Sequence, residues 1–315
     1  MSLYLVSFLL LITTAVCLMD REVYNEIKEN APFDVLDYEA MMQIFKNYNH
    51  GNPVIRSRSR LEDERLFLER IKEQSESEPF LALEKPYSLL PKEFDWRKNR
   101  PECFSPPKAQ ESCGSCYIFA AVAAFEARLC IKTHGKVIVE LSQQDILSCG
   151  KNHDKCEGGT IESTWQYLER SGACNYQCKP YVSYDSFVPQ CQSYCFSPKY
   201  SYSRHRAVRN SLKCIDNDIE KIKQEIYLNG PVSTGMDTFE DLEAYRGGIY
   251  FHVRGKSTDG HAIAIVGWGY DEKLQKEYWI LRNSWGTEWG QNGYFKVLMG
   301  YYGIDERVCA SVPEI

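Results

Sequence analysis

The pattern of apolar residues predicts a long buried helix in the first half of the chain. A run of small, β-branched and aromatic residues follows Cys116, and its apolar positions recur at helical spacing. These positions are Ile118, Ala121, Val122, Phe125 and Leu129. We predict a helix from about Ser115 to His134, which Gly135 ends.

Beyond residue 206 the pattern changes to strand-like runs. An amphipathic helix is predicted from Ile219 to Leu228. Five strands are then predicted: Val232–Met236, Gly248–Val253, Ala262–Trp268, Tyr278–Arg282 and Tyr294–Leu298. We therefore expect an α+β fold with a mainly helical lobe over about 100–205 and a β-rich lobe over about 206–305. A functional site is expected in the cleft between the lobes.

The amino-terminal part differs from both lobes. Residues 1–16 are almost wholly apolar but too short to span a bilayer comfortably, so we expect a secretory signal peptide over 1–17. A short membrane anchor is the alternative. Residues 20–85 are rich in charge, and helices are predicted over 35–48 and 61–74. The basic run over 56–60 is a solvated linker or a processing site.

Composition limits the classes of function. Of the 315 residues, 43 % are apolar and 13 % are aromatic, which is enough for a full core. The formal charge of −6 gives no reason to expect binding to nucleic acid or to a membrane surface. No second long apolar run follows the first, so no membrane span is expected after signal removal.

Cys116 lies where a thiol becomes reactive. The first turn of a helix has unpaired N–H groups and the positive end of the dipole, and both favour a thiolate, which is the nucleophilic form. The alternative is a structural cysteine, since a free cysteine packs as a small hydrophobe. The context Cys113-Gly114-Ser115-Cys116-Tyr117 favours the reactive thiol.

Three further motifs follow the order known for one family. Gln110 lies six residues before Cys116, His261 lies in the stretch 260–269, and Asn283 lies in Arg-Asn-Ser-Trp-Gly at 282–286. With the Cys-Gly-Ser-Cys-Tyr motif, this order resembles papain-like cysteine proteases, over about residues 90–313. The resemblance implies a papain-like two-lobe fold over 90–315 and an inhibitory propeptide over 18–89.

The resemblance also implies a role for each motif. Cys116 would be the nucleophile, and His261 would be the base toward the thiol and later the acid toward the leaving amine. Asn283 would orient the imidazole, and Gln110 with the Cys116 N–H would form the oxyanion hole. We expect thiolate and imidazolium to stabilise each other, so that the pair is charged well below the pKa of a free thiol.

Substrate contacts are expected on the same basis. Gly114, Gly158 and Gly159 would accommodate the substrate backbone, and Trp285 would border the leaving-group side. Ala262, with Ile161 and Gly235, would line the pocket for the residue two before the cut. Arg307 aligns with a glutamate at the floor of that pocket in cathepsin B, so we expect Arg to be disfavoured there. An Arg307 side chain directed to solvent is the alternative.

Two branches of the family share features with the chain. Tyr117 and Cys156-Glu157-Gly158-Gly159 resemble cathepsin C, an aminodipeptidase, but too few residues precede Leu90 for its extra domain. The cysteine spacing resembles cathepsin B, whose occluding loop carries paired histidines. The matching segment 179–190 is short and has no His, which implies an endopeptidase. A noncatalytic binding protein is a further alternative, disfavoured because Cys116 is present.

Thirteen cysteines in a chain with a signal peptide indicate an oxidising compartment. The resemblance implies four disulfides: Cys103–Cys130, Cys113–Cys156, Cys149–Cys191 and Cys178–Cys195. Cys174, Cys214 and Cys309 are left over, and Cys174–Cys214 is one possible pair. Because Cys116 is expected to be free and Cys17 lies in the signal peptide, an odd number remains and at least one more thiol must be unpaired.

These observations predict a cysteine endopeptidase made as a zymogen and acting on proteins and peptides. It would be secreted, or lysosomal or in an acidic vacuole. We expect a monomer inhibited by its own propeptide, with cystatin-type proteins as possible inhibitors and no cofactor. No metal is expected, since paired C-x-x-C motifs are missing.

Overall fold

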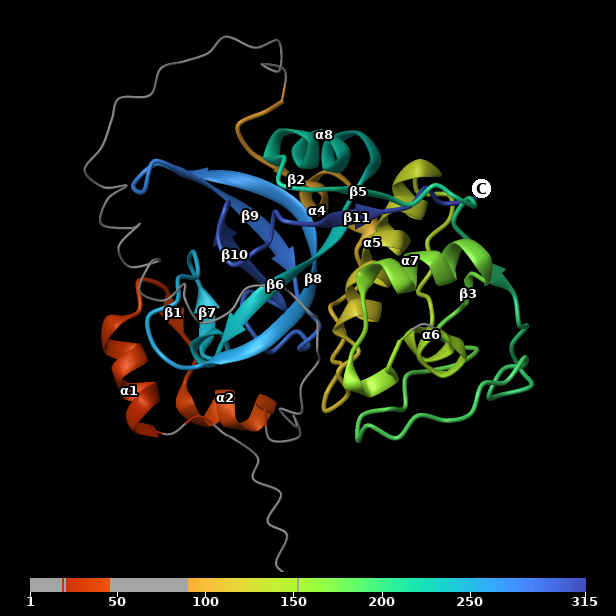
Figure 1. Cartoon of the computed structure of the whole chain (residues 1–315), viewed down its shortest axis with the longest axis horizontal. Coiled ribbons are helices and arrows are strands. Elements are labelled where there is room, and N and C mark those ends of the chain that lie inside the picture. Colours follow the sequence, from red (N-terminus) through yellow and green to blue (C-terminus); the bar gives the residue numbers. More distant parts are fainter. Residues whose placement is uncertain (1–18, 20, 46–89, 152) are drawn as a thin grey trace, which may run out of the picture.

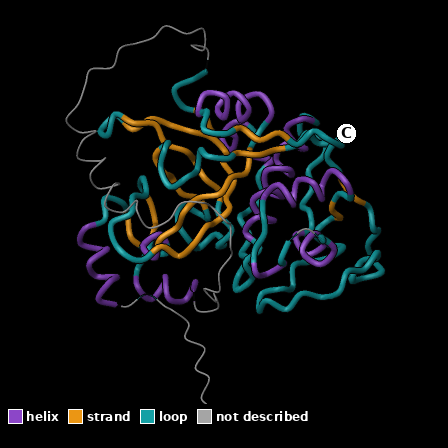
Figure 2. Tube along the Cα trace, in the orientation of Figure 1, coloured by secondary structure: helices purple, strands orange, loops and turns teal. Residues whose placement is uncertain are grey.

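Two lobes with different secondary structure make up the main body of the computed structural model, which describes residues 19, 21–45, 90–151 and 153–315 (Figure 1). Helices gather in one lobe and strands in the other (Figure 2). The helical lobe contains α5 (Cys116–Lys132), α6 (Gln143–Cys149), η2 (Lys155–Glu157), α7 (Ile161–Arg170), β3 (Ala173–Cys174) and β4 (Arg204–His205). The predicted α+β two-lobe fold is confirmed.

Helix α5 is the central element. It begins and ends within two residues of the predicted helix, and 14 of its 17 residues are buried. Its many alanines let neighbouring elements approach closely, so that it contacts α7 in its own lobe and β6 and β8 in the other. The residue that begins α5 therefore lies where the two lobes meet.

The β-rich lobe is a curled antiparallel sheet. Its strands are β2 (Phe94–Asp95), β5 (Lys213–Ile215), β6 (Val232–Phe239), β8 (Ser257–Asp271), β9 (Lys276–Arg282), β10 (Tyr294–Leu298) and β11 (Val308–Ala310). The order is β10-β9-β8-β6-β11-β5, and β2 also pairs with β8. Three short elements, α4 (Trp96–Asn99), η1 (Pro101–Cys103) and α8 (Ile219–Asn229), lie outside the sheet (Figure 1).

The strand predicted over 248–253 is wrong. The strand in this region is β7 (Tyr245–Gly247), which follows η3 (Glu240–Leu242), and Tyr250 forms only an isolated bridge. The backbone N–H groups of Val253 and Arg254 donate to the Asp241 carboxylate, at 2.7 and 3.1 Å. These donors are therefore satisfied by a buried side chain rather than by a neighbouring strand.

A separate segment packs on the β-rich lobe. It contains α1 (Arg21–Asn30), β1 (Asp34–Val35) and α2 (Tyr38–Phe45), and β1 pairs antiparallel with β7 (Figure 1). The predicted helix over 35–48 begins later than expected, because Asp37 accepts the Glu39 N–H and so starts α2. The predicted signal peptide, the basic run over 56–60 and the predicted helix over 61–74 lie outside the described residues.

Five disulfides are formed among the described residues. Four are the pairs that the resemblance implies. The fifth joins Cys214 to Cys309, so the possible pair Cys174–Cys214 is wrong. Strands β5 and β11 pair with Cys214 directly opposite Cys309, which brings their side chains together. Cys174 is free and buried, as is Cys116.

The two ends of the 90–315 region each cross between the lobes. The amino-terminal end joins the β-rich lobe, and the carboxyl-terminal end returns to the helical lobe. Strand β2 joins the sheet beside β8, although it precedes the helical lobe in sequence. Beyond β11, Pro313 forms a bridge with Ala207 and accepts a hydrogen bond from Lys132 Nζ at 2.9 Å. Within the described residues, no helix is long and apolar enough to cross a membrane.

Candidate active site

Cys116 is the first residue of α5, with Ser115 as the N-cap. Its side chain is fully buried, and burial raises the pKa of the thiol to about 11. Backbone N–H groups of Ala262, Tyr117 and Cys116 itself act in the opposite direction, because they stabilise a thiolate. The sulfur therefore faces donors from both lobes.

His261 and Asn283 form a hydrogen-bonded pair on the other lobe. His261 lies on β8 and Asn283 follows β9, and pairing of these strands brings the two side chains together. His261 Nε2 lies 2.7 Å from Asn283 Oδ1, which also accepts the Ser284 N–H at 2.8 Å. Because Oδ1 is an acceptor in both contacts, Nε2 carries a proton and Nδ1 of the neutral ring is left as the base.

Burial opposes charge on this imidazole. It lowers the pKa of His261 to about 4, and the hydrogen bond to Asn283 offsets part of this effect. Together with the raised pKa of Cys116, this favours the neutral thiol and the neutral imidazole. Burial thus opposes the charged form of each group in this closed site, and the mutual stabilisation of thiolate and imidazolium stays a prediction. Burial penalises both charged forms, which the sequence motifs alone cannot reveal.

Gln110 is fixed by contacts from both lobes. Its backbone N–H donates to Ser284 O at 2.9 Å, and its side-chain Oε1 accepts from Ser284 Oγ at 2.6 Å. Its carbonyl accepts from the Tyr181 hydroxyl at 2.9 Å. The Nε2 group donates to Cys113 O at 3.1 Å and so faces the start of α5. Sequence reasoning missed Ser284 and Tyr181, which contact the glutamine only in the folded chain.

Trp285 covers the imidazole. Its ring centroid lies 5.1 Å from that of His261 and 4.9 Å from that of Trp289. The ring of Phe45, the last residue of α2, lies 5.2 Å from the indole. The segment on the β-rich lobe therefore contacts the tryptophan that packs on His261. Phe45 was also missed, although it ends a run of apolar residues.

The glycines lie on the helical-lobe side. Gly158 has φ +116°, a conformation that favours glycine. A Cβ atom on Gly159 would lie 2.6 Å from the Tyr117 ring, so Gly159 also lets Tyr117 pack. The Gly114 N–H donates to Cys156 O at 2.9 Å, which ties the Cys116 loop to this stretch.

Arg307 lies in a separate pocket of about 780 Å³. Ile161 and Gly235 also line this pocket, whereas Ala262 lies against the Cys116 sulfur and is not among the lining residues. Arg307 donates to Glu162 through Nε and to Asp216 through Nη1, at 3.0 Å for the latter. The side chain is 54 % exposed, but its guanidinium is held by two carboxylates rather than directed freely into solvent.

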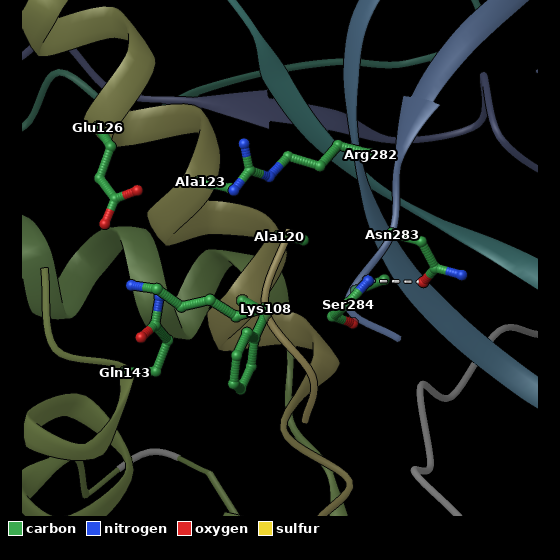
Figure 3. Close-up of a pocket in the computed structure, with 10 residues that line it drawn as sticks. Lys108, Ala120, Ala123, Glu126, Gln143, Arg282, Asn283 and Ser284 are labelled. Carbon is green, nitrogen blue, oxygen red and sulfur yellow. Dashed lines mark hydrogen bonds between the residues drawn. The ribbon is translucent and has the colours of Figure 1, made fainter. Parts of the chain in front are cut away.

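A buried polar cluster lies beside Asn283. Lys108, Glu126, Gln143 and Arg282 surround a cavity of about 10 Å³ beside Asn283 (Figure 3). This volume holds at most one water molecule. Arg282 donates to Ser105 O at 2.7 Å, and Glu126 accepts the Leu141 N–H at 2.6 Å. The cluster therefore joins both lobes beneath the site and has no room for substrate.

The sequence comparisons agree with this geometry. The family model described as "Papain family cysteine protease" matches residues 90–312. "Cathepsin B-like cysteine proteinase 6" of Caenorhabditis elegans is 34 % identical over 257 residues, covering 72 % of this chain and 67 % of the relative. "Cathepsin B-like CP1" of Giardia intestinalis is 34 % identical over 239 residues, covering 74 % and 77 %. The chain belongs to the papain family of cysteine proteases.

Solved structures share the fold. Procathepsin B S9 from Trypanosoma congolense matches with a TM-score of 0.66 and 28 % identity, over 77 % of this chain and 85 % of that one. The proform of the cysteine protease Amb a 11, a ragweed pollen allergen, matches with a TM-score of 0.66 and 22 % identity, over 93 % and 85 %. The particular relatives to which this chain is similar are thus the cathepsin B-like enzymes.

Proposed function

We propose that this chain is a cysteine endopeptidase with a Cys116–His261–Asn283 site, made as a zymogen. The observation that carries the proposal is the His261–Asn283 hydrogen bond of 2.7 Å opposite a free cysteine at a helix start. His261 takes the thiol proton as the Cys116 sulfur attacks the peptide carbonyl. Gln110 Nε2 and the Cys116 N–H stabilise the developing oxyanion.

The remaining steps use the same groups. The imidazolium of His261 gives its proton to the leaving amine, and the C–N bond breaks to leave a thioacyl enzyme. His261 then removes a proton from water, which attacks the thioester carbonyl. The acid product leaves and Cys116 recovers its proton. Asn283 keeps the ring in the tautomer that has Nδ1 available as the base.

The segment 179–190 supports the endopeptidase mode. A carboxydipeptidase needs a positive group near the cleft that can bind the terminal carboxylate of its substrate. The segment has one basic residue, Lys179, and no His. Lys179 is 1 % exposed and is bonded to Asp145 at 2.7 Å. Its charge is therefore not available to a substrate.

The amino-terminal segment supports the zymogen proposal. We assign residues 1–17 to a signal peptide, 18–89 to an inhibitory propeptide and 90–315 to the peptidase domain. The β1–β7 pairing and the contact of Phe45 with Trp285 hold the described part of this propeptide beside His261. The two matched structures named above are also proforms.

The pocket around Arg307 supports a preference against Arg two residues before the cut. Glu162 and Asp216 are bonded to Arg307 and are therefore not available to a substrate guanidinium. Asp237 and Glu306 line the same pocket. The preference against Arg is therefore proposed from the ion pairs of Arg307 with Glu162 and Asp216, and not from the net charge of the pocket. An apolar side chain is expected to bind best.

The disulfides are the basis for the proposed cellular location. Five disulfides favour the secretory pathway, with a lysosome, an acidic vacuole or the exterior as destination. A monomer acting on proteins and peptides is expected, open to cystatin-type inhibitors.

A digest tests the proposed activity. The chain from residue 20, activated at acidic pH under mild reductant, is incubated with a long peptide unblocked at both ends, with Cys116→Ala as control. Internal fragments that disappear in the control support the endopeptidase. Successive dipeptides released from the amino end of the peptide would indicate an aminodipeptidase like cathepsin C. Successive dipeptides released from its carboxyl end would indicate a carboxydipeptidase. No cleavage after propeptide removal would favour a noncatalytic binding protein.

A further inference from the structure

Exposed apolar side chains gather on one turn of the helical lobe. Val182, Tyr184 and Phe187 are 40 %, 49 % and 68 % exposed. Such side chains gain free energy when a ligand removes them from water. These three lie within the segment 179–190, whose one basic residue, Lys179, is buried.

Hydrogen bonds fix this turn to the oxyanion-hole segment. The Ser112 N–H donates to Tyr184 O at 3.1 Å, and Ser186 Oγ donates to Ser112 O at 2.9 Å. Ser112 lies two residues after Gln110. The position of the turn is therefore set by the same backbone that supplies the oxyanion-hole side chain.

Aromatic packing makes the arrangement rigid. The Tyr184 ring packs edge-on against that of Tyr181, with centroids 5.3 Å apart. Tyr181 is 3 % exposed, and its hydroxyl contacts Ser115 Oγ at 3.1 Å as well as donating to the Gln110 carbonyl. Tyr184 is thus preorganised at the end of a stack that begins at the oxyanion hole, which lowers the cost of binding.

The turn borders the leaving-group side of the site. Ala109 forms an antiparallel bridge with Trp285, and the Gly286 N–H donates to Lys108 O at 3.2 Å. The chain that leads into Ser112 therefore runs beside Trp285. The glycines 158–159 and the Arg307 pocket lie on the acyl side. A substrate that extends past Trp285 would reach the aromatic turn.

The charge beside the turn limits its occupant. Glu111 precedes Ser112, and its carboxylate interacts electrostatically with Tyr184. An acidic side chain or a terminal carboxylate would be repelled here. An uncharged apolar residue within a continuing chain fits both the exposed rings and the charge.

We propose that Tyr184 and Phe187 form a subsite for an aromatic or large aliphatic residue on the leaving-group side of the substrate. This proposal rests on the peptidase function proposed above. Here the short turn presents aromatic rings, so specificity after the scissile bond is set by this segment.

The test uses peptides with one acyl-side sequence and either Phe, Ala or Asp in the first and second positions after the cut. The mature enzyme is compared with Tyr184→Ser and Phe187→Ser. The control is Leu228→Ser, which removes a 71 % exposed apolar side chain from α8, an element outside the segment 179–190. We expect kcat/KM for Phe to exceed that for Ala by about tenfold in the parent. Each turn variant should reduce this ratio severalfold, and the control should keep it.

A second substrate separates the subsite from the chemistry. An aminocoumarin amide with the same acyl side has no residue after the cut, so the turn variants should lower the rate for the Phe peptide by a larger factor than the rate for this amide. Equal Phe and Ala rates in the parent, or an unchanged ratio in both turn variants while the amide is cleaved, would overturn the subsite. If the parent cleaves neither the peptides nor the amide, the peptidase function fails, and the subsite with it.

Aminolysis of the thioacyl enzyme gives an independent measurement. Phe-amide should compete with water for the thioester better than Ala-amide does, and Phe187→Ser should remove the difference. Since Phe187 is 68 % exposed, its replacement leaves the core intact. Equal competition by the two amides in the parent would contradict the proposal.

Discussion

The Phe45 ring meets the Trp285 indole nearly at a right angle, with centroids 5.2 Å apart. Phe45 belongs to the amino-terminal segment, and Trp285 covers the His261 imidazole. Phe45 is 1 % exposed, so both rings exclude water from this side of the site. We therefore expect Phe45→Ala to loosen the segment where it meets the reacting groups.

The expected result is an alkylation rate of Cys116 in the intact zymogen at least about tenfold higher, because a buried Phe→Ala change typically costs about 3–5 kcal/mol. Mass spectrometry of the Cys116 peptide gives the rate. Val23→Ala, a partly buried change on α1, is the control. An unchanged rate in Phe45→Ala would show that this ring does not protect the site.

The thiol should titrate differently before and after activation. In the closed site, burial raises the pKa of Cys116 to about 11, so its alkylation by iodoacetamide should keep accelerating into alkaline pH. Once the amino-terminal segment is removed, water and the charged imidazole can stabilise the thiolate. The rate should then level off below about pH 7. Identical pH profiles for zymogen and mature enzyme would contradict this expectation.

Acid should favour opening of the site. Burial lowers the pKa of His261 to about 4 in the closed form, whereas an exposed imidazole titrates near about 6.5. Between these values the open form binds more protons, so falling pH shifts the equilibrium toward it. In a Cys116→Ala background, binding of the separated propeptide should weaken as pH falls from about 6.5 to 4. His261→Ala should flatten this part of the profile; an equally steep profile would assign the effect to other groups.

Ser284 should act through Gln110. Its hydroxyl donates to Gln110 Oε1 at 2.6 Å, which keeps Nε2 directed toward the start of α5. Gln110→Ala should lower kcat by about 10²- to 10³-fold. Ser284→Ala should lower it by only about fivefold, since one hydrogen bond contributes about 1 kcal/mol. Both should leave KM nearly unchanged. A large rise of KM in Ser284→Ala would indicate a structural role instead.

Arg307 should control the residue two before the cut. Replacing it with Glu removes the guanidinium that occupies Glu162 and Asp216 and adds a carboxylate to the pocket. The ratio of kcat/KM for Arg over Phe at this position should rise about tenfold or more. Arg209→Gln, an exposed change, serves as the control. A wild-type enzyme that already cleaves well after two arginines would contradict the proposed preference.

Sequence reasoning succeeded where a local pattern decides the structure. The helix after Cys116 and the strand after His261 have apolar residues at the correct period, so their places could be predicted. The loop at 248–253 could not be predicted, because backbone N–H groups at its end donate to the Asp241 carboxylate rather than to a neighbouring strand. The Cys214–Cys309 pair depends on the register of β5 and β11, and the Phe45–Trp285 contact depends on tertiary packing. None of these has a local signal.

The ends of the 90–315 region fasten each lobe to the other. Strand β2 joins the sheet from the amino-terminal side, and Pro313 returns to Ala207 and Lys132 beside the helical lobe. Such a crossed arrangement leaves little freedom for the lobes to hinge apart. We therefore expect the lobes to keep their separation when substrate binds, so that substrates would enter as extended, unfolded strands. Compact folded proteins would resist the enzyme wherever they offer no loop narrow enough to enter.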